Sequence, residues 1–230
     1  MTGAAVKRVD FGYFVRPGSE TASGRPRVEP CLGYLVDLGG AALLVDTGMG
    51  SHPDVDAHYR PRRITLNAAL SAIGATADDV RWIVNSHLHF DHCGANPALA
   101  GRPVFTQRAE LDTAQAVEGY TLAELVDAPG ITYEILEGEA EILPGVLVVP
   151  TPGHTEGHQS VVVRRADGTV IVAGQSHESA TDYAGDALAW RASRDGHVHE
   201  LCDIPSWIPR LQQFDPARVV FAHDNSVWHP

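Results

Sequence analysis

Residues 86–92 read Ser86-His-Leu-His-Phe-Asp-His92, which places three imidazoles and one carboxylate within six positions. Divalent metals such as zinc take imidazole nitrogen and carboxylate oxygen as ligands. A solvated polar loop can also carry such residues, but a chain of this composition seldom brings them together in this order by chance. The run of residues 80–85 comes just before and has the pattern of a buried strand. We therefore expect a metal-binding loop where this strand ends.

The geometry of this loop favours two metal positions. In an extended segment His87 and His89 point the same way, whereas the neighbours Asp91 and His92 cannot both do so. We expect His87 and His89 to hold one metal, and Asp91 and His92 to hold the other. Because each pair is short of a complete tetrahedral site, a distant part of the chain has to supply further ligands.

Three other predicted strands also end in polar residues. These strand ends are Asp46-Thr-Gly48, Thr151-Pro-Gly-His-Thr-Glu-Gly-His158 and Phe221-Ala-His-Asp224. Loops at strand ends carry much of the chemistry of open sheets, because rigid strands fix the side chains that the loops present. His154 and His223 are therefore the candidates for the missing ligands.

Length and composition limit the remaining options. A chain of 230 residues suits one large domain, here residues 1–230. The net charge of −12 disfavours nucleic acid as a partner. We expect a cytoplasmic protein that does not contact a membrane, because no stretch approaches 18 apolar residues and the N-terminus lacks the core of a signal peptide. Three scattered cysteines form no disulfide framework, and the sequence does not reveal whether the chain forms a homo-oligomer.

Hydrophobic periodicity predicts two groups of strands, each followed by helices. Strands are expected over residues 5–15, 31–46 (a hairpin turning at Gly39-Gly40), 80–85, 131–136, 141–151, 159–164, 169–174 and 218–222. Helices are expected over residues 64–73, 108–127 and 207–214. Residues 14–30 are expected to form a loop, and residues 176–205 a long connection that lines part of the substrate pocket. This order suits an α/β protein in which two packed sheets lie between helices, a four-layer αββα sandwich.

The motifs resemble those of the metallo-β-lactamase-fold hydrolase superfamily. The resemblance rests on residues 43–48, 86–92, 151–158, 172–174 and 221–223. Within the superfamily, residues 86–92 and 151–160 are most similar to the N-acyl-homoserine lactonase branch. The resemblance implies the αββα sandwich and one or two Zn²⁺ ions or other divalent transition metals. It also implies one metal on His87, His89 and His154, and a second on Asp91, His92 and His223.

Two positions depart from the family pattern. The family usually has an aspartate that bridges both metals where this chain has Gln175. A neutral amide carbonyl binds one metal weakly, so the second metal is expected to be held less tightly here. The lactonase branch has a tyrosine that touches the substrate carbonyl three residues further on, where this chain has Glu178. Tyr183 lies near in sequence and is the candidate substitute.

The expected mechanism follows from the metals. A bound metal lowers the pKa of water and polarises the carbonyl. Asp91 is the expected catalytic residue that passes a proton to the leaving alkoxide. Asp46 is expected either to accept a hydrogen bond from a ligand imidazole or to cap the turn that follows it. We expect a supporting role for His158, and His177 is a candidate to replace part of the missing aspartate.

The sequence therefore predicts a metal-dependent hydrolase that opens a lactone or a related small carboxylic ester. Two other enzymatic hypotheses remain, a glyoxalase II-type thioesterase and a β-lactamase-like amidase. A further hypothesis is a metal-binding or ligand-sensing protein that kept the fold but lost catalysis. In each case the partner is a small molecule.

Overall fold

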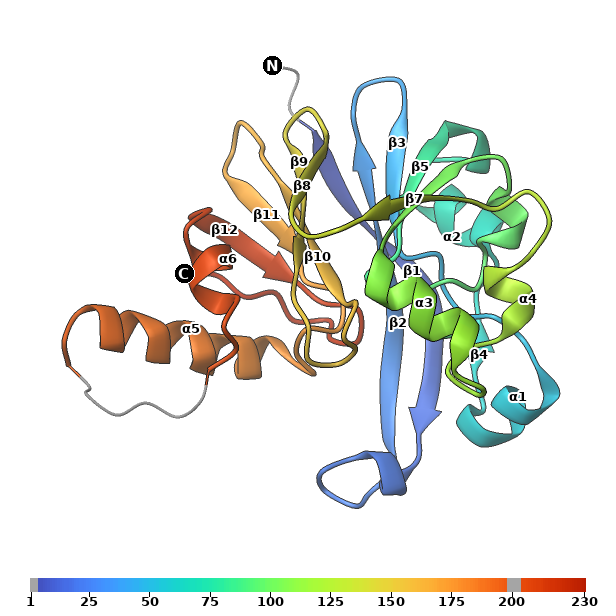
Figure 1. The fold of residues 1–230 in the computed structure, drawn as a ribbon, viewed down its shortest axis with the longest axis horizontal. Coiled ribbons are helices and arrows are strands. Elements are labelled where there is room, and N and C mark those ends of the chain that lie inside the picture. Colours follow the sequence, from blue (N-terminus) through green and yellow to red (C-terminus); the bar gives the residue numbers. More distant parts are fainter. Residues whose placement is uncertain (1–3, 198–203) are drawn as a thin grey trace.

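Two β-sheets face each other between two layers of helices in the computed structural model, which describes residues 4–197 and 204–230 (Figure 1). The first sheet has the strand order β4-β1-β2-β3-β5-β6-β7, and the second has the order β12-β11-β10-β9-β8. The first sheet contains β1 (Ala5–Arg16), β2 (Arg27–Asp37), β3 (Ala42–Val45), β4 (Arg62–Arg63), β5 (Val80–Val84), β6 (Pro103–Gln107) and β7 (Thr132–Leu136). The second contains β8 (Ala140–Leu143), β9 (Val146–Pro150), β10 (Gln159–Val163), β11 (Thr169–Val172) and β12 (Pro216–Val220).

Side-chain alternation along the strands creates three apolar layers. In β2, Tyr34 and Val36 point toward the second sheet, whereas Leu35 points toward the helices. In β10, Val161 faces the first sheet and Val162 faces the helices on the other side. A strand that is buried on both faces reads as a continuous apolar run, and this is why the sequence shows such runs.

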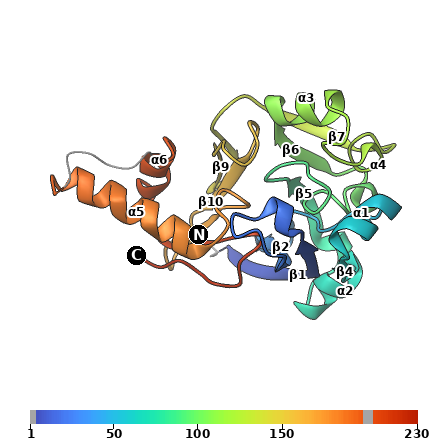
Figure 2. The same ribbon diagram turned by 90° about the horizontal axis from the view of Figure 1, so that it is seen from below.

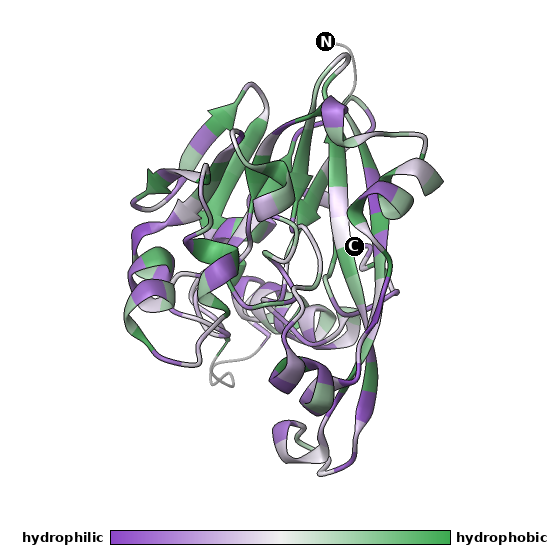
Figure 3. Ribbon diagram, turned by 90° about the vertical axis from the view of Figure 1, so that its right-hand side faces the viewer, coloured by the Kyte–Doolittle hydropathy of each residue, from purple (hydrophilic) through white to green (hydrophobic). Residues whose placement is uncertain are grey.

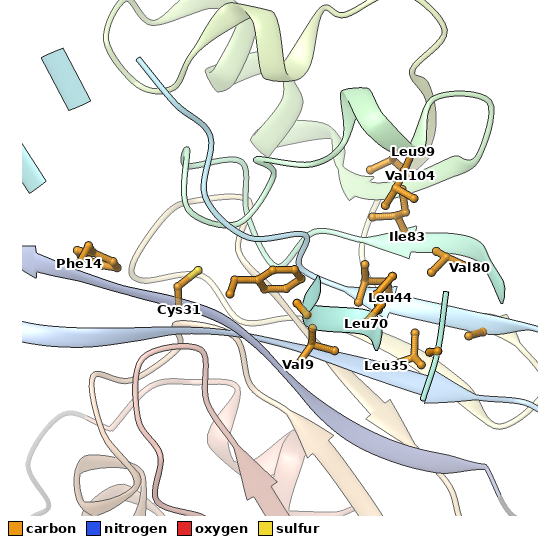
Figure 4. Packing of buried hydrophobic residues seen from close by; sticks show 14 residues of the cluster. Val9, Phe14, Cys31, Leu35, Leu44, Leu70, Val80, Ile83, Leu99 and Val104 are labelled. Carbon is orange, nitrogen blue, oxygen red and sulfur yellow. The ribbon is translucent and has the colours of Figure 1, made fainter. Parts of the chain in front are cut away.

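Helices cover both outer faces, as Figure 2 shows from a second direction. The first sheet is covered by α1 (Pro53–Tyr59), α2 (Leu66–Ala72), α3 (Arg108–Ala116) and α4 (Ala123–Val126), and the second by α5 (Ala180–Arg194) and α6 (Ile208–Gln212). Hydropathy follows these layers, because the strands are mostly apolar and the outer helices carry polar stretches (Figure 3). In the core of the first sheet, Leu70 of α2 packs near Leu44 and Val9 (Figure 4). The four-layer αββα sandwich predicted from the sequence is confirmed.

The predicted loop at residues 14–30 is correct for residues 17–26, which connect two strands, but wrong at both ends. β1 continues to Arg16 and β2 starts at Arg27, with Phe14 opposite Glu29 in the antiparallel register. Phe14 is buried and Arg16 pairs with Glu29 across the strands. These cross-strand contacts extend both strands up to residues 17–26, where the Pro, Gly and Ser residues typical of a loop are concentrated.

The connection at residues 176–205 was also predicted wrongly, because it contains α5. Ser179 caps this helix by accepting a hydrogen bond from the Asp182 amide. Its buried positions Ala180, Tyr183 and Ala187 recur at helical spacing, but two of them are alanines, so the apolar signal is weak. Residues 198–203 of the connection lie outside the described part of the chain. Among the described residues, each helix is too short or too polar to cross a bilayer.

Polar strand ends from both sheets meet at one edge of the sandwich. β3 and β5 run parallel and end at Val45 and Val84, and β11 and β12 of the other sheet also run parallel. Gln159 joins the two sheets at this edge. Its backbone N–H donates to the Ser86 carbonyl at 2.8 Å, and its side-chain Nε2 donates to the Asn85 carbonyl at 2.8 Å. The candidate site lies at this edge.

Candidate metal centre

Buried hydrogen bonds fold the loop that follows β5 into a fixed shape. The Asn85 side chain donates to the His92 carbonyl at 2.8 Å and accepts from the Asn96 side chain at 2.8 Å. Thr47 donates from its amide to the same His92 carbonyl at 2.7 Å and from its hydroxyl to Asn96 at 2.9 Å. Gly94 has to be glycine, because a Cβ there would overlap the backbone of Gly50. The loop is therefore rigid before any ligand arrives.

The first group of candidate ligands contains His87, His89 and His154. His89 Nδ1 lies 3.0 Å from His87 Nε2 and 3.2 Å from His154 Nε2. Burial, followed by the neighbouring histidines, lowers the pKa of His87 well below its usual value, and burial also lowers that of His89. Imidazoles that stay neutral keep the nitrogen lone pairs that metals bind. Three such nitrogens within 4.8 Å of one another suit a tetrahedral divalent metal with one open position.

The second group contains Asp91, His92 and His223, with Gln175 beside them. His223 Nε2 lies 3.1 Å from His92 Nε2, 3.3 Å from Asp91 Oδ2 and 3.2 Å from Gln175 Oε1. Burial alone would raise the pKa of Asp91, but His92 and His223 outweigh it and hold the pKa far below its usual value. An ionised carboxylate, two imidazoles and an amide oxygen suit a divalent metal, although only one of these four donors is charged.

Acceptors behind the imidazoles set their orientation. Asp46 accepts from His92 Nδ1 at 2.9 Å, from the Ser86 amide at 2.7 Å and from the Ser86 hydroxyl at 2.8 Å. The Pro30 carbonyl accepts from His223 Nδ1 at 2.8 Å. Both imidazoles therefore turn Nε2 toward the second group. Asp46 adopts a left-handed backbone with φ of 59°, which Asp tolerates better than most residues.

A cavity of about 540 Å³ opens onto both groups. His89, Asp91, His154 and Gln175 line its floor. Aromatic side chains form much of its wall, namely Phe14, Tyr59, Phe90 and Tyr120. A cavity of this size and character is typical of a small-molecule site.

Comparison with known proteins gives the family. Residues 26–223 match the metallo-β-lactamase superfamily. The chain belongs to this superfamily.

Members of the superfamily with curated names resemble the chain over part of its length. It is 37% identical over 143 residues to an N-acyl homoserine lactonase of a Bacillus species, covering 56% of each chain. It is 34% identical over 153 residues to N-acyl homoserine lactonase AiiA of Bacillus thuringiensis subsp. kurstaki, covering 60% of each. The chain thus spans a little over half the length of these relatives.

Solved superfamily structures match nearly the whole chain. An N-acyl homoserine lactone hydrolase with the product N-hexanoyl-L-homoserine bound at its catalytic metal centre gives a TM-score of 0.75 at 27% identity, covering 98% of this chain and 95% of that one. AidC, a dizinc quorum-quenching lactonase, gives a TM-score of 0.69 at 14% identity, covering 100% and 92%, and supports the fold alone.

The structure brings Gln175, the neutral residue expected to weaken the second metal, to the second group, where its Oε1 lies 3.2 Å from His223 Nε2. Gly174 precedes it with φ of 58°, and a Cβ on Gly174 would lie 2.5 Å from Ser86 Cβ. The buried His158 accepts from the Gln175 amide at 3.0 Å and contacts the Thr151 hydroxyl at 2.8 Å. Both nitrogens of His158 are engaged in this way, so His158 supports the position of Gln175 and does not join the ligand groups.

Three residues predicted to lie near the site lie elsewhere. His177 Nε2 contacts Asp186 of α5 at 3.1 Å. Tyr183 is fully buried behind the second sheet, where its hydroxyl accepts from Gln212 at 2.9 Å, so it does not substitute for the family tyrosine. Glu178 is exposed and pairs with Arg27 at 2.7 Å. The cavity is lined mainly by the β1–β2 hairpin, α1 and residues 119–122 instead of residues 176–205.

Sequence reasoning missed Glu110, which connects the two ligand loops. This residue of α3 is 1% exposed, and its carboxylate accepts from the Leu88 amide and the Thr155 hydroxyl, each at 2.7 Å, and from the Tyr120 hydroxyl. Leu88 lies between His87 and His89, and Thr155 follows His154. A glutamate on a partly amphipathic helix is normally solvent-exposed, so no local pattern distinguishes this one.

Proposed function

We propose that this protein is a metal-dependent hydrolase that opens the lactone ring of an N-acyl-homoserine lactone or a related small carboxylic ester. The observation that carries the proposal is the position of the two adjacent ligand groups on the floor of one cavity with aromatic walls. The similarity to named lactonases supports the same chemistry. The proposed ion is zinc, which imidazole-rich sites of this kind favour.

A divalent metal, when bound, polarises a carbonyl oxygen and makes water a better nucleophile. The protein side chains hold the ions and the substrate. The Asp46 carboxylate accepts a hydrogen bond from His92 Nδ1–H at 2.9 Å. This bond favours the tautomer in which His92 Nε2 carries no proton and can bind a metal. Asp91, whose pKa is far below its usual value, is ionised and lines the cavity, where it would take a proton from water and pass it to the leaving alkoxide.

The cavity would also keep bulk water away from the reacting ester. Tyr59 and Phe90 stack with ring centroids 5.0 Å apart, and the ring of Tyr120 lies 4.6 Å from that of His89. Apolar walls beside the floor suit an acyl chain, which binds by burial of its surface. We also propose a reducing, cytoplasmic location, in keeping with Cys31 and Cys93, which are both free and buried.

Turnover of a substrate panel tests the proposal. N-acyl-homoserine lactones, aryl esters, thioesters and β-lactams would be offered to protein loaded with zinc, and we expect hydrolysis of the lactones to be fastest. Fastest turnover of thioesters or β-lactams would favour a thioesterase or an amidase instead, and no turnover of any substrate would favour a binding protein.

The role of the metal is tested separately. His89→Ala should abolish hydrolysis and remove one bound ion while the circular dichroism spectrum is retained. The matched control is His229→Ala, which removes an exposed imidazole outside the cavity. Full activity in His89→Ala would show that the metal is not the catalyst.

A further inference from the structure

The cavity wall contains one permanently charged cation. Among the described lining residues, Arg16 alone is an arginine or lysine. Two other donors of the wall already have partners, because the Tyr59 hydroxyl donates to Glu20 at 3.1 Å and the Tyr120 hydroxyl donates to Glu110. Arg16 is therefore the strongest donor that the cavity offers to a ligand.

The Arg16 side chain is held in place from behind. Its Nε donates to the two carboxylate oxygens of Glu29 at 2.8 and 3.0 Å, and its guanidinium carbon lies 5.5 Å from the Phe14 ring centroid. Glu29 is 2% exposed, and its Oε1 also accepts from Arg27 Nε at 2.7 Å. A guanidinium has five N–H donors, and only the one on Nε makes a hydrogen bond among the described residues. Nη1 also lies 3.6 Å from the Glu20 carboxylate, so the donors on Nη2 are the ones that remain for a ligand.

The charges around Arg16 favour a neutral acceptor over an anion. Glu29 offsets the positive charge of Arg16, and Glu20 lies 3.6 Å from Nη1. Asp54 lines the same cavity, so a carboxylate ligand near Arg16 would meet three like charges, those of Glu20, Glu29 and Asp54. A neutral carbonyl oxygen meets no such repulsion and still accepts a charge-assisted hydrogen bond.

A ligand that fills the cavity displaces water from Arg16, and a buried N–H without a partner is unfavourable. The scissile carbonyl has to face the ligand groups on the floor for the proposed chemistry. The acceptor for Arg16 must then be another oxygen of the same substrate. A site built around such a donor rejects analogues that lack the acceptor.

We propose that Arg16 is a specificity-determining residue that donates a hydrogen bond to a neutral carbonyl oxygen outside the scissile ester, so that the enzyme prefers lactones bearing an amide carbonyl. This inference rests on the proposed function. It assigns to the N-terminal hairpin, which is distant in sequence from every candidate ligand, the recognition of the acyl-amide part of the substrate.

Two lactones of equal chain length and three variants test this inference. The substrates are N-hexanoyl-homoserine lactone and an alkyl γ-lactone without the amide. Arg16→Met keeps an apolar stem and removes the donors, and it should lower kcat/KM for the amide-bearing lactone roughly 10- to 100-fold, mainly through KM. Turnover of the alkyl lactone should change less than about 3-fold. Arg16→Lys, which retains a charged donor, should recover part of the loss.

Arg8→Met is the matched control, because it removes an exposed arginine of the same strand, β1, that does not line the cavity. Its kcat/KM for both lactones should stay within about 3-fold of the unchanged protein. An equal loss on both substrates in Arg16→Met, no loss on either, or the same substrate-selective loss in Arg8→Met would overturn the assignment. Zinc content and thermal midpoint are measured for each variant, and a fall in either in Arg16→Met would show a structural role instead. If the unchanged protein opens neither lactone, the proposed function fails and this inference fails with it.

Discussion

The buried carboxylate of Glu110 gives the most demanding prediction, because it concerns the protein without metal. Glu110→Ala removes the acceptor of three hydrogen bonds, from the Leu88 amide, the Thr155 hydroxyl and the Tyr120 hydroxyl. Hydrogen bonds to a charged group contribute roughly 1.5–3 kcal/mol each. The two hydroxyls can turn toward water, but the Leu88 N–H is held by the loop. We therefore expect the free energy of unfolding to fall by roughly 3–5 kcal/mol.

Glu110→Gln removes the negative charge of this side chain but keeps its shape. The side-chain amide oxygen can still accept from the Leu88 N–H, and the side-chain amide nitrogen can donate to the Thr155 hydroxyl. The free energy of unfolding should therefore fall by only about 1–2 kcal/mol. Urea unfolding of metal-free protein measures both variants, and a competing chelator measures zinc affinity, which should fall roughly 10- to 100-fold in both. Asp112→Ala, which removes an exposed acid from the same helix, is the control. A loss below about 1 kcal/mol in Glu110→Ala, or none beyond the control, would refute the reasoning.

Three further predictions concern the ligand groups. Gln175→Asp adds a carboxylate to the group of Asp91, His92 and His223. In a metal titration, the second equivalent of zinc should therefore bind roughly 10- to 100-fold more tightly. An unchanged dissociation constant for this second equivalent would contradict the prediction. Asp46→Asn replaces the acceptor of His92 Nδ1, and calorimetry should show zinc affinity reduced by a similar factor, whereas an unaltered affinity would count against the tautomer argument. Burial, with the nearby His92 charge, lowers the pKa of His158 to about 3. Because the unfolded state takes up this proton below about pH 6.5, His158 alone should lower the stability of the metal-free protein by roughly 1.4 kcal/mol per unit as pH decreases toward 3, and His158→Gln should remove that share of the slope.

Much of the fold was predictable because it depends on local patterns. The runs at 159–164 and 169–174 agree with β10 and β11 to within two residues, since strands buried on both faces show their character without reference to a partner. The run at 141–151 was predicted as one strand but forms β8 and β9, which are separated by a turn at Gly145. Helix α5 escaped prediction because its buried face is mostly alanine.

In the candidate site too, the residues that belong to local sequence patterns were predictable and those that depend on distant contacts were not. The six predicted ligands follow apolar runs, so both their residue types and their strand-end positions were readable, and the structure brings all six together in two groups. Glu110 contacts Leu88, which is 22 positions away, and Arg16 contacts Glu29, which is 13 positions away. No short sequence window contains such pairs, and their importance becomes visible only once the loops and the hairpin are folded.

Each ligand group draws side chains from both sheets. His87 and His89 follow β5 of the first sheet, whereas His154 follows β9 of the second, and the other group is divided in the same way between Asp91 and His223. An ion at either position would cross-link the two halves of the sandwich at one edge only. Chelation should therefore let the halves separate from that edge, with faster amide hydrogen exchange there than at the opposite edge. The lifetime of this protein in a cell would then depend on the supply of metal as well as on its own sequence.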